Sequence, residues 1–203
     1  MNTYHEYVIH NGEFIGKFEE MYQRFDDPWR QSSQPNPYGR QCAILNLKRF
    51  GIDSLIEFGC GLGYYSNWIH QETGIIPMAY DISETAITKA RQQFPTLDFR
   101  TGDIVKVLQE PLPVDAILLA EIGWYILQDL DEIIELLYKN YAGKYLLNNQ
   151  VFYKGTQRFG REYFTTLQEY IDYMPFKLIG YTEATTVEDS TIDTSTLFKI
   201  EPK

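Results

Sequence analysis

The feature that most constrains the fold of this chain is the alternation, from residue 52 onward, of short apolar segments with segments of helical length and pattern. Strands are expected at residues 54–58, 75–80, 97–100, 115–120, 145–152, 176–181 and 196–200. Helices are expected at residues 64–71, 130–138 and 165–173, and from an N-cap at Ser83 to near Pro95. Strands joined through helices pair in parallel, so the pattern predicts a doubly wound α/β sheet of seven strands. The last two strands have no helix between them and should form an antiparallel pair at one edge.

Two of the expected strands have features that indicate their place in the sheet. The run from Asp115 to Ala120 is the most apolar of the chain and is too short for a helix of its own, so we interpret it as a buried central strand. Pro77 lies inside the second expected strand, where a residue without an N–H is awkward in a central position. We therefore expect that this strand, or its pairing, begins after Pro77.

The first 50 residues have a different character. Helices are expected at residues 13–24 and 39–50, with turn-forming residues at 27–29 and 32–39 between them. A chain of 203 residues suits one globular domain with a substantial core. We interpret residues 1–50 as a helical and loop cap over the active site, and residues 51–203 as one compact domain.

Charge and apolar patterning limit the class of partner. The chain has 18 Lys and Arg against 28 Asp and Glu, a formal net charge of -10, and its densest basic pair is Lys48 with Arg49. Nucleic-acid binding depends on neutralising phosphates, so this composition disfavours it. We find no apolar run of the roughly 18 residues that span a bilayer, and no signal peptide. With only Cys42 and Cys60 as cysteines, we expect a cytoplasmic protein with no membrane partner.

A glycine-rich turn follows the first expected strand. Residues 57–63 read Glu-Phe-Gly-Cys-Gly-Leu-Gly, with glycines at Gly59, Gly61 and Gly63. In open α/β sheets, ligands bind beyond the carboxyl ends of the strands, and glycine lets the backbone approach a ligand closely. Glycine is also routine in turns between a strand and a helix, so the turn alone indicates only a close approach to its backbone.

Acidic residues at the ends of neighbouring strands add to this turn. Asp81 lies about 20 residues beyond it, where a carboxylate accepts hydrogen bonds from ribose hydroxyls. Asp103 and Ile104 follow the third strand and could flank an adenine ring, while Glu57 is a carboxylate on an apolar strand that needs a reason to be buried. Alternatively, Asp81 caps the following helix and Asp103 is an ordinary turn residue. Together these residues indicate a nucleoside-bearing ligand.

The turn at residues 57–63 resembles motif I of the class I S-adenosylmethionine-dependent methyltransferases. Its spacing is G-x-G-x-G, whereas NAD-binding turns usually read G-x-G-x-x-G. The resemblance covers about residues 38–200 in element order. It implies a Rossmann-like sheet, S-adenosylmethionine as cofactor and S-adenosylhomocysteine as product. The cofactor-binding residues that it implies are Glu57, Gly59, Cys60, Gly61, Gly63, Asp81, Ile82, Asp103, Ile104, Glu121, Tyr38 and Arg40.

The resemblance also implies which part of the donor each of these residues contacts. The three glycines would cradle the methionine part, Asp81 would hold the ribose, and Ile82, Asp103 and Ile104 would frame the adenine. Residues 120–125 match the segment that passes beneath the methionine and reaches the substrate. These are expectations carried by the family motif.

The N-terminal segment is similar to the entry of small-molecule methyltransferases of the nodulation N-methyltransferase type, in residues 27–29 and 38–40. By this likeness Trp29 would lie near the active site, and Tyr38 or Arg40 would meet the donor's carboxylate. Arginine suits that partner because its planar fork can donate two parallel hydrogen bonds. Alternatively, Trp29 anchors a loop and Arg40 is a surface residue of a helix.

Methyl transfer to a hydroxyl or ammonium group requires that a base take a proton at some stage. The candidates are Glu121, Tyr125, Tyr163, and His10 on the N-terminal arm, where His10 could equally be an arm residue without a role. No Asp, Glu and His cluster has the spacing of metal ligands, so we expect no metal in the mechanism.

A basic and aromatic cluster follows the fifth strand. Its members, which lie within residues 148–164, are Tyr153, Lys154, Arg158, Arg161 and Tyr163. The cluster could receive an anionic or sugar-like acceptor, or it could be a solvated loop.

The sequence therefore predicts an enzyme that transfers a methyl group from S-adenosylmethionine to an oxygen or nitrogen of a small metabolite, such as a sugar or a natural-product intermediate. Two alternatives stay open: an inactive donor-binding module of the same fold, and an NAD(P)-dependent reductase. The identity of the acceptor, the atom methylated, and the choice between a monomer and a homodimer are also open.

Overall fold

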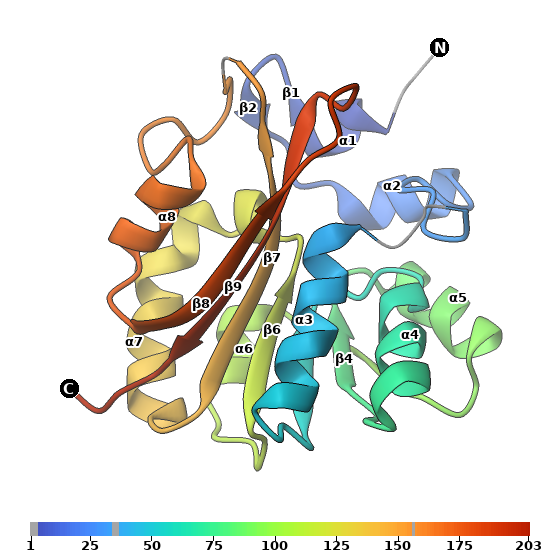
Figure 1. Ribbon diagram of the computed structural model, residues 1–203. Helices are drawn as coiled ribbons and strands as arrows, with labels where there is room; N and C mark the ends of the chain where they lie inside the picture. Colours follow the sequence, from blue (N-terminus) through green and yellow to red (C-terminus); the bar gives the residue numbers. More distant parts are fainter. Residues whose placement is uncertain (1–3, 34–36, 156) are drawn as a thin grey trace.

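The central sheet has the expected topology in a computed structural model that describes residues 4–33, 37–155 and 157–203 (Figure 1). Seven strands pair in the order β5-β4-β3-β6-β7-β9-β8. Their bounds are β3 Leu55–Phe58, β4 Met78–Asp81, β5 Asp98–Thr101, β6 Ala116–Ala120, β7 Tyr145–Tyr153, β8 Lys177–Ala184 and β9 Thr191–Lys199. Strands β3 to β7 are parallel, whereas β9 is antiparallel to both β7 and β8. The predicted mostly parallel sheet with an antiparallel C-terminal pair is confirmed.

Helices cover both faces of the sheet. Helices α3 (Tyr38–Arg49), α4 (Tyr64–Thr73) and α5 (Glu84–Gln93) pack on one face, and α6 (Ile104–Leu108), α7 (Leu130–Tyr141) and α8 (Leu167–Tyr173) pack on the other. In β6, Leu118 packs with α3 and α4, while Ile117 and Leu119 pack with the opposite helices. Successive side chains of a strand point to opposite faces, so an all-apolar run such as β6 can be buried on both.

The second strand of the parallel set begins at Met78, directly after Pro77. Pro77 therefore lies outside the ladder, and its missing N–H costs no hydrogen bond between strands. Strand β9 begins at Thr191, earlier than expected, because it pairs with β7 as far as Tyr153. Helix α6 was not expected from the sequence.

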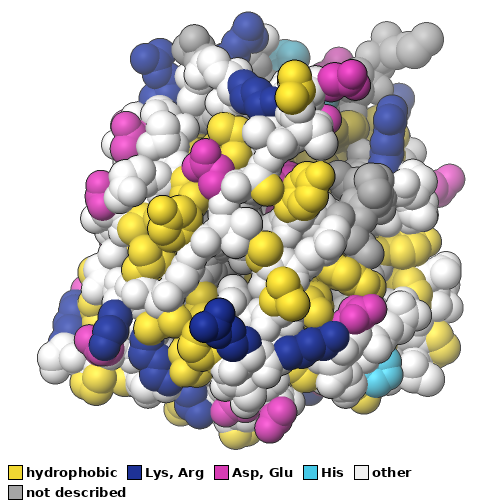
Figure 2. All heavy atoms as spheres, viewed as in Figure 1, with side chains coloured by type: hydrophobic (Ala, Val, Ile, Leu, Met, Phe, Trp, Pro, Cys, Tyr) yellow, Lys and Arg dark blue, Asp and Glu magenta, His cyan; other side chains and the backbone are white. Residues whose placement is uncertain are grey.

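The edge strand β8 leaves part of the sheet open to solvent. Figure 2 shows hydrophobic side chains among polar ones on the face that carries α3, β8 and β9. Ile179 and Tyr181 of β8 and Leu45 of α3 are among the exposed large hydrophobic residues. No helix in the described part of the chain is both long and apolar enough to cross a membrane.

The expected helix at residues 13–24 is wrong over its first turns. The chain instead forms α1 (His5–Val8), a hairpin of β1 (Ile9–His10) with β2 (Glu13–Phe14), and α2 (Phe18–Arg24). Asn11 and Gly12 have positive φ values of 53° and 85° and make the tight turn between the two strands. Gly16, with φ 67°, then separates the hairpin from α2. Of the loop expected at 32–39, residues 34–36 lie outside the described residues, and α3 begins at Tyr38.

Two charged side chains form hydrogen bonds between helices α2 and α5. The carboxylate of Glu19 accepts hydrogen bonds from the Ser83 hydroxyl (2.7 Å) and from the backbone N–H (3.1 Å) and hydroxyl (2.6 Å) of Thr85. These groups lie at the N-terminus of α5, where a negative charge is favourable. Lys89 in turn donates to the carbonyl oxygens of Tyr22 (2.8 Å) and Phe25 (2.9 Å), at the C-terminal end of α2. The N-terminal segment is thus held on the sheet domain at both ends of α2.

We expect Glu19→Ala to lower the free energy of unfolding by about 1–2 kcal/mol, as the loss of a helix-capping group does. Although burial opposes this, the hydrogen bonds to Glu19 lower its pKa to about 2. The stabilisation should therefore be complete above the unfolded-state pKa near 4 and be lost as pH falls toward 2. Urea unfolding at pH 3 and pH 7 would measure this. A Glu19→Ala variant that loses as much stability at pH 3 as at pH 7 would contradict the assignment, and exposed Glu20→Ala is the matched control.

Candidate active site

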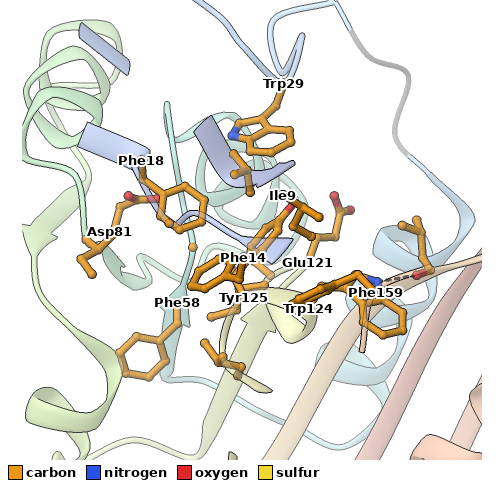
Figure 3. Close-up of a pocket in the computed structure, with 18 of the residues that line it drawn as sticks. Ile9, Phe14, Phe18, Trp29, Phe58, Asp81, Glu121, Trp124, Tyr125 and Phe159 are labelled. Carbon is orange, nitrogen blue, oxygen red and sulfur yellow. Dashed lines mark hydrogen bonds between the residues drawn. The ribbon is translucent and has the colours of Figure 1, made fainter. Parts of the chain in front are cut away.

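A cavity of about 730 Å³ lies beyond the carboxyl ends of the parallel strands. Strand order reverses there, because β3 is followed by β4 on one side while β6 pairs on its other side. Such a switch point is where open α/β sheets bind ligands. Residues of the strand ends form one part of the wall, and residues 4–31 of the N-terminal segment contribute much of the rest (Figure 3). The volume falls in the range of small-molecule and cofactor sites.

Neighbouring segments pack tightly against the glycine-rich turn. Gly59, with φ 85°, lines the cavity, and a Cβ added to it would lie 2.1 Å from Cγ2 of Ile122. A Cβ on Gly61 would lie 2.7 Å from the Tyr22 hydroxyl and 2.8 Å from Oε1 of Gln31. The same oxygen of Gln31 accepts the backbone N–H of Leu62 at 2.8 Å. The glycines are therefore required here by close approach of the N-terminal segment and of the segment after β6.

Asp81 is held at the edge of the cavity by backbone groups. Its carboxylate oxygens accept the N–H of Gly61 and of Ser83, each at 2.9 Å, and its side chain lines the cavity. Burial raises the pKa of Asp81 to about 6, although these hydrogen bonds act in the opposite direction. The cap of α5 is instead the Ser83 hydroxyl, which accepts the N–H of Ala86. Each carboxylate oxygen can accept a further hydrogen bond, so Asp81 is able to hold ribose hydroxyls.

The residues expected to frame an adenine also lie at this wall. Ile82, Asp103 and Ile104 line the cavity, and Ile82 is 57% exposed. Asp103 also acts as the N-cap of α6, since its side chain accepts the N–H of Lys106 at 3.1 Å. Asp103 therefore has a local structural role, as the alternative interpretation expected, and it also lies at the cavity wall.

An ion pair between Arg40 and Glu121 lies at the cavity wall. Nε of Arg40 donates to Oε1 of Glu121 at 2.8 Å, and both residues line the cavity. Arg40 is only 7% exposed and its guanidinium lies 4.7 Å from the centre of the Tyr65 ring. Glu121 has a positive φ of 62°, which a non-glycine residue rarely adopts, and its N–H donates to the carbonyl of Asn149 on β7. The end of β6 is therefore shaped to present this carboxylate to Arg40.

Glu57 lies behind the turn and does not reach the cavity. It is completely buried, one oxygen accepts the Ser66 hydroxyl at 2.5 Å, and the other has no partner among the described residues. Burial raises the pKa of Glu57 to about 7, and Arg40 acts against this shift. The carboxyl group thus changes its charge near neutral pH.

We expect Glu57→Gln to flatten the dependence of stability on pH. A carboxyl whose folded-state pKa is raised binds protons more tightly in the folded state, so its contribution falls as pH rises from about 4.5 to 7. Glutamine keeps an oxygen for Ser66 and has no charge to desolvate. Urea unfolding at pH 5, 6 and 7 would measure the slope. Equal slopes in wild type and variant would contradict the assignment, and Glu72→Gln, on an exposed surface, is the control.

Tyr125 is the centre of a group of aromatic side chains. Its ring centroid lies 5.2 Å from that of Phe18, 6.1 Å from that of Trp29 and 6.3 Å from that of Phe14 (Figure 3). Burial raises the pKa of the Tyr125 hydroxyl well above its usual value. At neutral pH the group is a protonated phenol, which suits hydrogen bonding better than proton removal.

The structure does not bring every candidate to the cavity. Tyr38, Tyr163 and His10 are not among the described residues that line it. Tyr38 is 48% exposed and its N–H donates to Asp193, Tyr163 packs near Tyr173, and His10 is exposed on β1. Cys60, Gly61 and Gly63 shape the turn without lining the cavity. The roles assigned to all of these residues stay predictions.

Other residues reach the cavity without having been selected from the sequence. Among them are four polar residues, His5, Tyr22, Gln31 and Gln157. All four are isolated polar residues in irregular or short segments, so no local spacing could have identified them. Within the basic and aromatic cluster, Tyr153, Lys154 and Arg158 line the cavity, whereas Arg161 does not. In the described part of the chain, no three His, Cys, Asp or Glu residues are placed to hold a metal ion.

A family model described as a methyltransferase domain matches residues 55–141, whereas no curated protein matches the chain. A solved structure of N-methyltransferase NodS from Bradyrhizobium japonicum is 15% identical, with a TM-score of 0.60 over 81% of this chain and 95% of that one. A TehB-like SAM-dependent methyltransferase from Corynebacterium glutamicum is 14% identical, with a TM-score of 0.62 over 89% and 98%. A third structure, from work on thioacetal formation in echinomycin biosynthesis, is 16% identical, with a TM-score of 0.61 over 89% and 93%.

Proposed function

We propose that this protein uses S-adenosylmethionine to methylate an oxygen or nitrogen of a small metabolite, because a methyltransferase-domain family model matches residues 55–141 and the fold is that of solved methyltransferases. The observation that carries the proposal is the meeting of Gly59, Asp81 and Glu121, from three different strand ends, at one cavity that also has room for an acceptor. Similar solved structures include an N-methyltransferase and a geranyl diphosphate methyltransferase, the second of which is named for a small acceptor.

The residues at the strand ends fit the donor. The Asp81 carboxylate would accept the ribose hydroxyls, and Ile82 and Ile104 would flank the adenine with apolar surface. Arg40 would donate to the donor's carboxylate while it keeps its contact with Glu121. When bound, S-adenosylmethionine supplies an electrophilic methyl group on a sulfonium.

Positioning and exclusion of water would account for much of the catalysis. Tyr125 and the aromatic side chains around it shield the reacting atoms from solvent, and its phenol can hydrogen-bond to the acceptor. Among the candidate bases, Glu121 is a carboxylate at the cavity wall, so we propose it as the proton acceptor where one is needed. His10 and Tyr163, which lie away from the cavity, are the weaker candidates.

The chain's acidic balance supports a small acceptor rather than a nucleic acid. We further propose a cytoplasmic protein, monomeric or homodimeric, in which residues 1–50 act as the cap. Helix α3 packs against β7 and β9, so the part that covers the cavity is residues 4–31.

Calorimetric titration with S-adenosylmethionine and S-adenosylhomocysteine tests the donor, and titration with NADH tests the reductase alternative. Single-turnover assays with methyl-labelled donor and a panel of small acceptors test catalysis. Binding of the donor with transfer of label supports the proposal. Absence of donor binding overturns it, and donor binding without transfer to any acceptor favours the inactive module.

A further inference from the structure

Part of the cavity wall consists of aromatic side chains. We call this part the aromatic chamber, and its walls are Phe14, Phe18, Trp29, Tyr125 and Phe159. Phe14 links its two sides, because its ring centroid lies 6.3 Å from that of Tyr125 and 6.3 Å from that of Phe159 (Figure 3). The walls come from β2, α2 and the segments after α2, β6 and β7, so distant parts of the chain converge on one space.

One residue that lines the cavity has a buried polar atom without a partner among the described residues. Gln157 is 6% exposed and lines the cavity, and its Nε2 donates to the carbonyl of Phe159 at 2.7 Å. This hydrogen bond fixes the amide orientation, because the oxygen could not approach a carbonyl. Oε1 is left buried with no hydrogen-bond partner among the described residues. A buried acceptor without a donor is costly, so a ligand O–H or N–H would be favoured there.

Charged residues limit which ligand suits the chamber. Aromatic faces can bind either a flat ring or a cation. Lys154 and Arg158 line the cavity from the same segment as Phe159 and disfavour a cationic acceptor at that wall. The carboxylates that line the cavity belong to other segments and are those of Asp81, Asp103, Glu121 and Asp129. A sugar presents hydroxyls around its whole ring, whereas only Trp29 and Tyr125 of the five walls carry a hydrogen-bonding group. A flat ring with one polar group matches both the walls and the single unpartnered amide oxygen.

Resting on the proposed methyl transfer, we propose that the acceptor is a planar aromatic compound carrying a hydroxyl or amino group. Its ring lies among the walls of the aromatic chamber, and its hydroxyl or amino group donates a hydrogen bond to Oε1 of Gln157. Gln157 is then a residue that selects the acceptor without touching the donor.

The test compares ligands that differ by one polar group. The probes are 6-hydroxyquinoline, 6-aminoquinoline, quinoline and methyl glucopyranoside, each titrated by calorimetry into protein saturated with S-adenosylhomocysteine. The variants are Gln157→Met, which keeps the side-chain length but has no amide, and Gln71→Met, whose glutamine is exposed on α4. Binding of S-adenosylhomocysteine to every variant reports an intact fold.

We expect the substituted quinolines to bind wild type about tenfold more tightly than quinoline, and Gln157→Met to remove that difference. Gln71→Met should behave as wild type. The proposal is overturned if methyl glucopyranoside binds better than the quinolines, if no quinoline binds, or if Gln157→Met weakens quinoline as much as 6-hydroxyquinoline. Failure of S-adenosylhomocysteine to bind wild type would instead overturn the proposed function itself.

Discussion

We expect the Asp81→Ala variant to bind S-adenosylmethionine about 5- to 150-fold more weakly than wild type, a loss of about 1–3 kcal/mol. The carboxylate is fixed at the end of β4 by the N–H groups of Gly61 and Ser83, so it has no need to reorganise when ribose hydroxyls donate to it. Calorimetric titration measures the affinity. The matched control is Asp172→Ala, an exposed aspartate on α8 that lies away from the cavity.

A deoxy analogue separates the ribose contact from damage to the turn. If Asp81 acts through the ribose, the loss caused by Asp81→Ala should be much smaller for a donor that lacks the 2′- and 3′-hydroxyls. An equal loss for both donors would show that Asp81 only supports the glycine turn.

The same contact predicts a pH dependence. Burial raises the pKa of Asp81 to about 6, and protonation removes accepting capacity from the carboxyl. Donor affinity of wild type should therefore fall as pH drops through about 6, while that of Asp81→Ala should not.

The sheet and the donor side of the site could be predicted because their signals are local. Strand period, helix caps and turn glycines lie within a few residues of one another, and parallel pairing then brings the ends of β3, β4 and β6 together. Gly59, Asp81 and Glu121 could thus be placed at one edge from their positions along the chain.

The acceptor side depends on contacts that the local pattern does not encode. Gln31 meets Leu62 across 31 residues, and Phe14 meets Phe159 across most of the chain. The wrong helix at residues 13–17 has a similar cause, because its residues have acceptable helical spacing but the turn at Asn11 and Gly12 pairs two strands instead. Which of several isolated polar residues faces a cavity is decided by tertiary packing.

Loss of Arg40 should have the largest effect on stability. We expect Arg40→Met to lower the free energy of unfolding by about 3 kcal/mol, the lower end for breaking a buried ion pair, because Glu121 keeps a side-chain exposure of 29%. Arg40 also stacks on Tyr65 and offsets the negative charge of buried Glu57. For a chain of this length the melting temperature should fall by about 6–12 °C. Thermal and urea unfolding would measure both quantities.

A double-mutant cycle shows whether the pair itself is responsible. Glu121→Gln alone leaves the Arg40 charge buried without its carboxylate, whereas Arg40→Met with Glu121→Gln leaves neither charge uncompensated. We therefore expect the double variant to be more stable than the sum of the single losses predicts, by about 1 kcal/mol or more. Strict additivity would mean that Arg40 stabilises the fold through its packing on Tyr65. In that case the ion pair with Arg40 would not stabilise the fold. The strained backbone at the end of β6 would then place the Glu121 carboxylate at the cavity by itself.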